Sequence, residues 1–440
     1  MTTRRPLAVL IAERGSLTPV EIVTAAGDTL PVLFVLDEGA AGPGADRLRL
    51  VAEALAPTVY ADFADAEGCA AVIADAGAVA VTTFTDRLCP LAARIRRRLQ
   101  PTGGHQLWSH KEEQRRRLVA AGVSRVRSAV LDEPEQARTL LARWGSGVVV
   151  KPVDGVASAH TWLLRSPEDV DEFVSALGHR DGAPRMFAEE FIAGLPRETP
   201  RLGDYVSVEV IRSGSGTAPR LAFVTDRAPP AAPCRETGLM WPTSLPETTV
   251  ARLVATADQA LEVLPAGPGS YHVEIKPGSG RDEIIEVNGR LGGFVARAAR
   301  YGADLDVARL ALDVAAGSPD RPPGAQRLTI TWRRCVAVLL FPAPRAARWI
   351  SRAPDRRILS RRPGVLAVDQ VRREGEPCAW QRGTDDAVAT LWLAGDSHRE
   401  LWDRFLDVAE YLHTTFAFVD AHGEPAADQG WLKRLRDPDA

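Results

Sequence analysis

The chain has 440 residues, of which 45% are hydrophobic and 25% are charged, and its formal net charge at pH 7 is −3. This composition is typical of a soluble globular protein with several domains, and it excludes intrinsic disorder. The nearly balanced charge gives no electrostatic basis for binding nucleic acid or an anionic membrane.

The cysteines and the N-terminal segment bear on the cellular compartment. The five cysteines lie far apart and none is in CxxC spacing, which argues against a structural zinc site and a disulfide framework. The first residues, MTTRRPLAVLIAERG, have too short an apolar core for a signal peptide. No apolar run approaches the roughly 20 residues of a membrane span. We therefore expect a cytoplasmic protein with small-molecule partners, no nucleic acid and no membrane.

The first hundred residues alternate between two kinds of pattern. Residues 6–13, 30–38 and 71–84 are apolar runs typical of buried strands, and residues 45–56 have the spacing of a helix. This alternation predicts a parallel, Rossmann-like α/β domain over residues 1–104. No GxGxxG motif follows the first strand, so a dehydrogenase function is disfavoured.

The middle of the chain, residues 105–320, is predicted to contain both helices and strands. A helix over 109–123 has Ser109 as N-cap and Gly122 as C-cap. The remaining predicted elements are strands within 145–155, 185–194, 204–216 and 219–227, a helix over 246–264 and a hairpin over 271–293.

A Pro- and Gly-rich stretch, residues 318–327, marks the next boundary. Beyond it, short strand patterns such as AVATLWLAG precede an amphipathic helix over 398–416. We expect a β-rich C-terminal subdomain over residues 321–440.

The hairpin contains the sole asparagine of the chain, Asn288, in the stretch IIEVNGRLGG. Alternate residues of a strand share a face, so Glu286, Asn288 and Arg290 project together. If Lys276 lies opposite Ile284, the register places Glu274 opposite Glu286 and His272 opposite Asn288.

Two opposed carboxylates destabilise a sheet unless a cation lies between them. Mg²⁺ prefers oxygen ligands and takes one or two carboxylates together with substrate phosphates. The face of Glu274, Glu286 and Asn288 therefore suggests a metal site, with Arg290 as a fork for phosphate or an oxyanion. The alternative is a surface hairpin whose polar face is only hydrated.

Lysine is nearly as scarce as asparagine, with four lysines among 54 basic residues. Lysine reaches phosphate oxygens as a compact point charge, which arginine cannot do. Lys151 ends a strand written VVV, a position that predicts an anionic partner, whereas Lys111 begins a helix. Lys433, in the polar C-terminal tail, is expected to be hydrated.

The order of six motifs resembles the ATP-grasp superfamily and, more narrowly, the carboxylate–amine ligases that include bacterial L-amino-acid ligases (dipeptide synthases). The motifs are KxxxRxxLxxxGV from Lys111, VVVKPVDG, AEEFIAG, DYVSVE, HVEIK and IIEVNGRLGG, and the similarity covers about residues 80 to 320. The resemblance implies an α/β ATP-grasp fold with a lid at about 124–187 and a nucleotide- and metal-binding core at about 188–320. The C-terminal region is compatible with the extra β-rich subdomain of those ligases.

The resemblance also implies roles for single residues. Lys111 and Lys151 match the ATP-phosphate lysines, and Glu189 and Glu190, with the backbone through Ile192, match the hinge that reads adenine. Asp204, with Tyr205 or Glu209, matches residues that contact ribose or metal. Glu274, Glu286 and Asn288 match the ligands of two Mg²⁺ ions (or Mn²⁺), and Arg290 matches the arginine that holds phosphate. Glu236 matches a glutamate of the amino-acid pocket, and Phe294 matches an aromatic wall of that pocket.

The chain departs from the family pattern in two places, a loop and one further residue. The phosphate-covering loop, usually Ser-x-Gly-Val, reads Ser158-Ala159-His160-Thr161, which stiffens the lid or gives His160 a phosphate contact. Leu239 stands where related dipeptide ligases carry a histidine, so a more apolar substrate pocket is expected.

The implied reaction joins a carboxylate to an amine through an acyl phosphate, with Arg290, Lys151 and Glu286 as catalytic residues. No base for the amine is evident, and His160 and Glu236 are nominated. The Ala- and Arg-rich composition is associated with bacterial specialised metabolism, and a homodimer is one possible assembly. Two alternatives stay open: acyl transfer to another nucleophile, such as a carrier-protein amine, a hydrazine or bicarbonate, and a nucleotide-binding module without catalysis.

Overall fold

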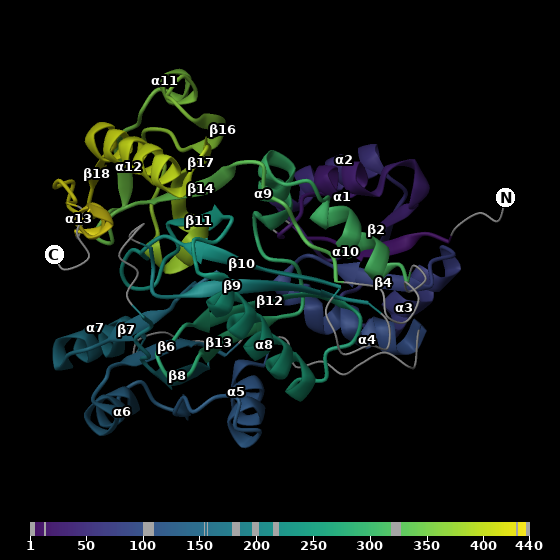
Figure 1. Ribbon diagram of the computed structural model, residues 1–440, viewed down its shortest axis with the longest axis horizontal. Helices are drawn as coiled ribbons and strands as arrows, with labels where there is room; N and C mark the ends of the chain where they lie inside the picture. Colours follow the sequence, from purple (N-terminus) through teal and green to yellow (C-terminus); the bar gives the residue numbers. More distant parts are fainter. Residues whose placement is uncertain are drawn as a thin grey trace.

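The computed structural model describes residues 5–12, 15–99, 110–153, 155, 157–177, 185–195, 202–213, 220–317, 327–427 and 430–436. Its strands form one four-stranded parallel sheet, one eight-stranded antiparallel sheet and two smaller antiparallel sheets (Figure 1). The mixed α/β architecture agrees with the predicted fold class.

The N-terminal layer confirms the predicted parallel sheet. Its strand order is β3-β2-β1-β4, and all pairings are parallel. Its strands are β1 (Leu7–Leu10), β2 (Val32–Asp37), β3 (Thr58–Ala61) and β4 (Ala80–Thr83), and its helices are α1 (Pro19–Ala26), α2 (Pro43–Leu55), α3 (Ala66–Asp75) and α4 (Cys89–Leu99).

The strand predicted over 71–84 is wrong in its first half. Helix α3 runs through Asp75, and Asp65 caps it by accepting a hydrogen bond from the Glu67 amide. Cys69, Ala70 and Ile73 are buried at helical spacing. A short alanine-rich run is apolar in either conformation, and here the capping aspartate favours the helix.

A second layer follows helix α5 (Lys111–Ala120) and has the strand order β5-β8-β6-β7. Ser109, the predicted N-cap of α5, lies outside the described residues, and the cap position is His110. Gly122 follows the helix with φ +72°, where glycine is favoured. The elements are β5 (Ser128–Leu131), α6 (Gln136–Trp144), β6 (Val148–Pro152), β7 (Trp162–Leu164), α7 (Pro167–Leu177) and β8 (Met186–Glu190).

The eight-stranded sheet has the order β13-β12-β9-β10-β11-β14-β17-β16. It continues across the boundary predicted at 318–327, because β14 pairs with β11. The strands are β9 (Val206–Arg212), β10 (Leu221–Arg227), β11 (Gly238–Trp241), β12 (Gly269–Lys276), β13 (Glu283–Asn288), β14 (Cys335–Pro342), β16 (Val365–Val371) and β17 (Ala387–Gly395). The accompanying helices are α8 (Glu247–Val263), α9 (Val295–Gly302), α10 (Val307–Ala315), α11 (Arg356–Ser360), α12 (His398–Thr415) and α13 (Trp431–Arg436). The 3-10 turns of the described chain are η1 (Gly27–Thr29), η2 (Asp86–Leu88) and η3 (Trp380–Asp386). Strands β15 (Trp349–Arg352) and β18 (Ala417–Val419) form a separate two-stranded sheet.

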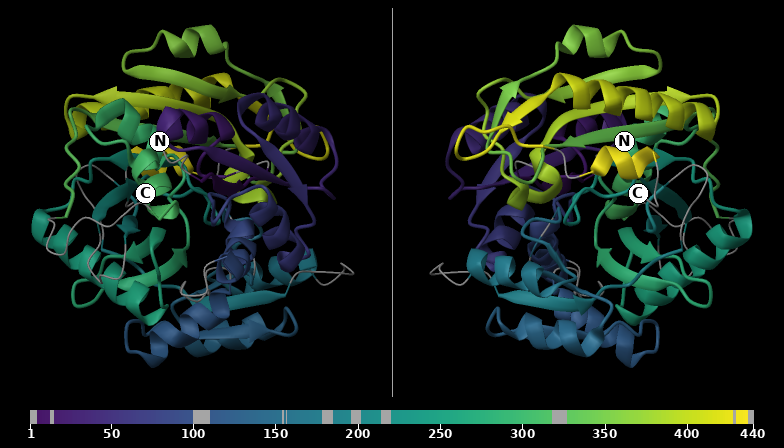
Figure 2. Two further views of the ribbon diagram at one scale, coloured as in Figure 1. Left: turned by 90° about the vertical axis from the view of Figure 1, so that its right-hand side faces the viewer. Right: turned by 90° about the vertical axis from the view of Figure 1, so that its left-hand side faces the viewer.

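Strand β9 shows how this sheet directs polar groups to one face. Val206, Val208 and Val210 join the core around α8, so the residues between them, including Ser207 and Glu209, project to the other face. Figure 2 shows the β5–β8 layer, in blue, at the opposite end of the molecule from the C-terminal elements in yellow.

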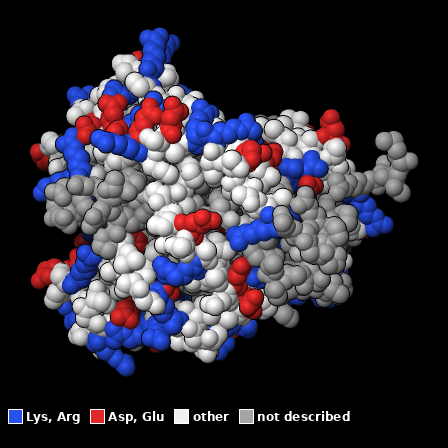
Figure 3. Space-filling view, in the orientation of Figure 1, with Lys and Arg blue, Asp and Glu red and all other residues white. Residues whose placement is uncertain are grey.

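The charges on the described surface are of both signs, as the nearly balanced net charge of the chain predicts. Acidic and basic side chains are interspersed on the face shown in Figure 3. Within the described ranges, no helix is both long and apolar enough to cross a lipid bilayer.

Candidate functional site

A cleft of about 1560 Å³ is lined by all three layers and by the loop before η2. Of the residues predicted for the site, the cleft wall includes Lys111, Lys151, Ser158, Glu189, Glu190, Ile192, Asp204, Glu236, Glu274, Glu286, Asn288, Arg290 and Phe294. His160 is not part of this wall.

The hairpin register is confirmed at the positions that matter for the site. Glu274 pairs with Glu286, and His272 pairs with Asn288. The expected pairing of Lys276 with Ile284 is wrong, because a β-bulge after Glu274 shifts the register and places Lys276 opposite Glu283. A bulge adds one residue to one strand, which a strict two-residue alternation cannot anticipate.

Each of the two opposed carboxylates has cationic neighbours. Lys111 Nζ lies 3.1 Å from the Glu286 carboxylate, and Lys151 Nζ lies 3.9 Å from it. Glu274 lies 3.4 Å from both Arg227 and His272. Burial raises the pKa of Glu274, but these two neighbours outweigh it and hold that pKa well below its usual range.

Behind the hairpin, Lys151 and Arg115 share one buried carboxylate. Lys151 Nζ and Arg115 Nε each lie 2.6 Å from Glu189, which is 6% exposed. Burial opposes ionisation of Glu189, yet the two cations lower its pKa to about 2. The same attraction outweighs burial at Lys151 and raises its pKa. The lysine that ends the VVV strand therefore has an anionic partner, as its position predicted.

The donor set of the hairpin fits Mg²⁺. Within the described ranges, no group of three or more His, Cys, Asp or Glu could enclose a metal ion. Two carboxylates and one amide oxygen, open to a cleft, are instead what Mg²⁺ uses when phosphates and water complete its coordination. Asn288 is 8% exposed, so its short side chain has a defined environment.

The segment that follows β8 lines the cleft with Phe191 and Ile192. The Glu190 side chain is paired with Arg127, and the amide groups of Glu190 and Phe191 donate to Arg127 and Gly147. In the described part of the chain the Ile192 amide has no backbone acceptor. Asp204, at the same end, is held by Lys276 at 2.6 Å and accepts the Gly194 amide at 2.9 Å.

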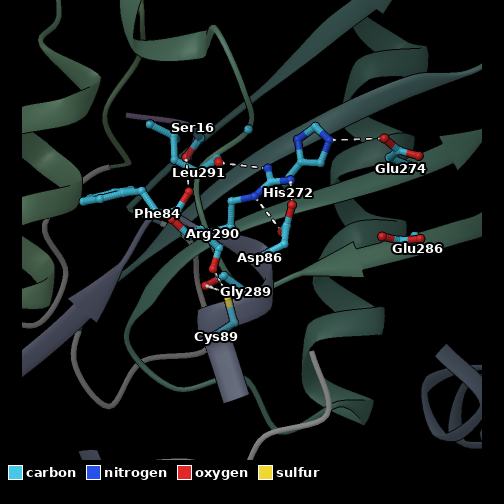
Figure 4. Close-up of polar contacts among 12 residues, drawn as sticks. Ser16, Phe84, Asp86, Cys89, His272, Glu274, Glu286, Gly289, Arg290 and Leu291 are labelled. Carbon is cyan, nitrogen blue, oxygen red and sulfur yellow. Dashed lines mark hydrogen bonds and ion pairs between the residues drawn. The ribbon is translucent and has the colours of Figure 1, made fainter. Parts of the chain in front are cut away.

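The other end of the cleft is built around Arg290 (Figure 4). Its Nε donates to Asp86 Oδ1 at 2.7 Å and its Nη2 to Asp86 Oδ2 at 2.5 Å. Burial disfavours the charge of Arg290, but Asp86 outweighs it and raises the pKa of the guanidinium. The partner belongs to the N-terminal layer, 204 residues away in the sequence.

Glu236 is paired with Arg227, a residue that sequence reasoning missed. Arg227 is 1% exposed, ends strand β10 and also approaches His272 Nε2 at 3.1 Å. The signal that identified Lys151, a cation closing a buried strand, was equally present in LAFVTDR. Glu209 and His272 form a second buried pair at 2.6 Å, and Glu209 accepts the Gly292 amide.

Phe294 forms an aromatic wall with residues of the C-terminal strands. Its ring packs edge-on against that of Trp392, with the ring centroids 6.0 Å apart. The backbone of Phe294 has φ +68°. Arg297 stacks on Trp392 at 5.3 Å and pairs with Asp369 at 2.7 Å. A strained φ at a non-glycine residue is common at functional sites.

The predicted phosphate-covering loop contacts the C-terminal region. Ala157, Ser158 and His160 all have positive φ. The His160 amide donates to Gln381 at 2.8 Å, and the Thr384 amide donates to Ala157 at 2.9 Å. The loop is therefore attached to η3 by backbone hydrogen bonds.

No protein-family model matches this chain. Over 113 residues, 24% of the chain, it is 34% identical to carnosine synthase 1 of Gallus gallus, of which it spans only 12%. It resembles the structure of an L-amino acid ligase from Bacillus licheniformis with a TM-score of 0.68 and 17% identity, covering 95% of this chain and 100% of that one. It also resembles the biotin carboxylase domain dimer of the 2-oxoglutarate carboxylase of Hydrogenobacter thermophilus, in complex with MgADP, ADP and bicarbonate, with a TM-score of 0.60 and 14% identity over 99% and 95% of the two chains. The chain has the ATP-grasp fold, which confirms the fold expected from its motifs.

Proposed function

We propose that this protein is an ADP-forming ligase that joins the carboxylate of an amino acid or small acid to an amine. One observation carries the proposal. Lys111, Lys151 and Arg290 converge on a single cleft with the opposed Glu274–Glu286 pair and Asn288. This collection of cations and hard oxygen ligands suits the binding of Mg²⁺ and a polyphosphate and the transfer of a phosphoryl group.

The nucleotide would lie along the layer of β6 and β8. Lys111 and Lys151 are proposed to contact phosphate oxygens, displaced from Glu286 when the polyphosphate arrives. Adenine would be read by the backbone at Ile192, since the Glu190 side chain is engaged by Arg127. Asp204, held by Lys276, is proposed to face the ribose, and Ser158 lies in the loop that covers the phosphates.

Glu274, Glu286 and Asn288 would hold Mg²⁺, which supplies charge neutralisation to the phosphate oxygens when bound. In the first step a substrate carboxylate oxygen bonds to the γ-phosphorus while the bond to the bridging oxygen of ADP breaks. In the second step the amine nitrogen bonds to the acyl carbon, phosphate leaves and the nitrogen loses a proton. Arg290 is proposed to hold the transferred phosphate and stabilise the oxyanion.

Glu236 and Phe294 are proposed to shape the pocket of the carboxylate substrate. The pairing of Glu236 with Arg227 places an anion and a cation together in that wall. Leu239, which also lines the cleft and is 2% exposed, is proposed to make this pocket more apolar than that of related dipeptide ligases. The acceptor could be an amino acid or another amine of a bacterial specialised-metabolite pathway.

The proposal is tested by ADP release measured against a matrix of carboxylates and amines, with product mass. The expected result is release that depends on both substrates and an amide product whose mass is their sum minus water. Dependence on bicarbonate or a carrier protein in place of a small amine would support transfer to another nucleophile. ATP binding without ADP formation across the whole matrix would overturn the enzyme assignment.

A further inference from the structure

Asp86 lies in the N-terminal layer, outside the six sequence motifs that predicted the site. It begins η2, shortly after the carboxyl end of the parallel strand β4. The loop before it is fixed, because Ser16 donates to the Phe84 carbonyl through its amide at 2.7 Å and its hydroxyl at 3.2 Å. The Thr85 amide donates to Thr83 Oγ1 at 3.2 Å. Asp86 therefore has a defined position relative to the N-terminal sheet.

The contact between Asp86 and Arg290 uses one edge of the guanidinium. Nε and Nη2 are engaged by the two carboxylate oxygens, and Nη1 donates to the Leu291 carbonyl at 3.0 Å. A guanidinium has five N–H donors, so among the residues that the structure describes two donors have no acceptor, one on each terminal nitrogen. Both side chains line the cleft, and they are 14% and 23% exposed.

Arg290 is fixed from its backbone side as well. The Gly292 amide donates to Glu209, and a Cβ at Gly292 would lie 2.5 Å from the Glu209 carboxylate. The turn after Arg290 is therefore hydrogen-bonded to β9, at a position where only glycine fits. A bidentate carboxylate on a side chain with a fixed backbone leaves few rotamers available.

We infer that Asp86 is a positioning residue that holds the Arg290 guanidinium in its working orientation, so that the N-terminal layer contributes directly to the phosphoryl-transfer end of the cleft. The inference rests on the proposed function, in which Arg290 holds the transferred phosphate. Electrostatic groups accelerate a reaction most when they need no reorganisation as charge develops. Without Asp86, the guanidinium would have to adopt its orientation in each turnover.

The competing explanation is that the Asp86–Arg290 ion pair only stabilises the packing of the N-terminal layer against the rest of the protein. The chain contains a matched control for this explanation. Arg309 of α10 also binds the N-terminal layer, through the Ala26 carbonyl at 2.9 Å and Thr29 Oγ1 at 2.7 Å. Arg309 is not part of the cleft wall. Arg309→Met therefore removes a cation that joins the same layers and leaves the site untouched.

The first test is the kinetics of ADP release by Asp86→Asn and Asp86→Ser, with melting temperatures to verify folding. The kcat should fall about 10- to 100-fold, as for other orienting partners of site residues, with the KM for ATP nearly unchanged. Arg309→Met should keep the wild-type kcat even where its melting temperature falls. Wild-type kcat in folded Asp86→Asn would overturn the inference.

The second test is a double-variant cycle. If Asp86 acts only through Arg290, Asp86→Asn should cause no further loss of kcat in an Arg290→Lys background. A loss that adds fully to that of Arg290→Lys would show that Asp86 acts independently, and would overturn the inference.

The third test needs no identified substrate. Titration calorimetry of inorganic phosphate into the protein saturated with MgADP should show weaker phosphate binding in Asp86→Asn and in Arg290→Lys, with unchanged ADP affinity. Equal phosphate affinity in wild type and Asp86→Asn would overturn the inference. Failure of the proposed function would appear differently, as wild-type protein that binds phosphate and MgADP but forms no amide.

Discussion

The two ends of the cleft differ in how their charges are balanced. At the end of the cleft proposed to bind the nucleotide (the nucleotide end), Lys111, Lys151 and Arg115 surround two carboxylates, Glu189 and Glu286. At the end proposed to bind the organic substrate (the substrate end), three arginines each pair with a different carboxylate, as Arg290–Asp86, Arg227–Glu236 and Arg297–Asp369, and Arg227 also lies 3.4 Å from Glu274. An excess of cations favours the binding of a polyphosphate. Where each cation is already paired with a carboxylate, a substrate is selected by its shape and by single hydrogen bonds. The predictions below test this difference, beginning with the largest effect.

Replacing Glu286 should have the largest effect, because Glu286 lies near both lysines and opposite Glu274, one of the two other predicted metal ligands. We expect Glu286→Gln to lower kcat for ADP release by about three orders of magnitude, comparable to loss of a principal electrostatic group. The measurement is steady-state ADP release across a Mg²⁺ titration, with chelator as the metal-free reference. Glu283→Gln, on the same strand but outside the cleft wall, is the control. Full activity of Glu286→Gln would refute the metal assignment.

Replacing Lys151 should alter the excess of cations at the nucleotide end. Lys151→Met leaves Glu189 with Arg115 alone, so we expect ATP affinity to fall by about 10- to 100-fold, that is roughly 1.4 to 2.7 kcal/mol. Calorimetric titration with ATP measures the affinity, and thermal melting should show a less stable protein. Lys433→Met changes an exposed lysine of α13 and should match wild type. Unchanged ATP affinity in Lys151→Met would remove Lys151 from the phosphate site.

Replacing Phe294 should affect only the substrate end. Phe294→Ala opens the wall against Trp392, and we expect the KM of one organic substrate to rise about tenfold, the effect of a small apolar mismatch in a pocket. The ATP affinity of the variant should equal that of wild type. A change in ATP affinity with an unchanged substrate KM would reverse the assignment of the two ends.

The buried carboxylate at the nucleotide end should also make stability depend on pH. The pKa of Glu189 is lowered to about 2 in the folded protein, whereas an unfolded glutamate has a pKa near 4.3. Its stabilising contribution is therefore complete above the unfolded pKa and is lost as the pH falls from about 4.3 toward 2. Thermal melting between pH 7 and pH 3 should show this loss in wild type. Glu189→Gln should be less stable at neutral pH, and its melting temperature should vary less with pH over the acid range.

The same difference between the two ends explains what the sequence could predict. Strand alternation alone placed Glu286 and Asn288 on one face, and Lys151 was identified because it ends a buried strand. Glu189 was assigned only through the resemblance of AEEFIAG to a family motif, which did not reveal that its side chain binds Lys151 and Arg115. Asp86 lies 204 residues from Arg290, and no local pattern connects an aspartate after one parallel strand to an arginine after a distant hairpin.

Some features of the fold were unpredictable for a different reason. The bulge after Glu274 and the helix in place of a strand before Asp75 both depend on local backbone choices that apolar periodicity does not determine. The bulge displaced Lys276 by one residue, yet it left the pairings of His272 and Glu274 intact because it lies nearer the turn.

The smallest effect is expected at Glu190, the residue that follows the buried Glu189 in the sequence. The Glu190 side chain is held by Arg127, whose own side chain is 46% exposed, and exposed ion pairs contribute at most about 1 kcal/mol. If the hinge reads adenine through the backbone at Ile192, Glu190→Gln should bind ATP as wild type does, with a slightly lower melting temperature. Calorimetry with ATP and with GTP measures both affinity and base selection. A large loss of ATP affinity in Glu190→Gln would show that this side chain contacts the nucleotide, and that the charges of the hinge belong to the site.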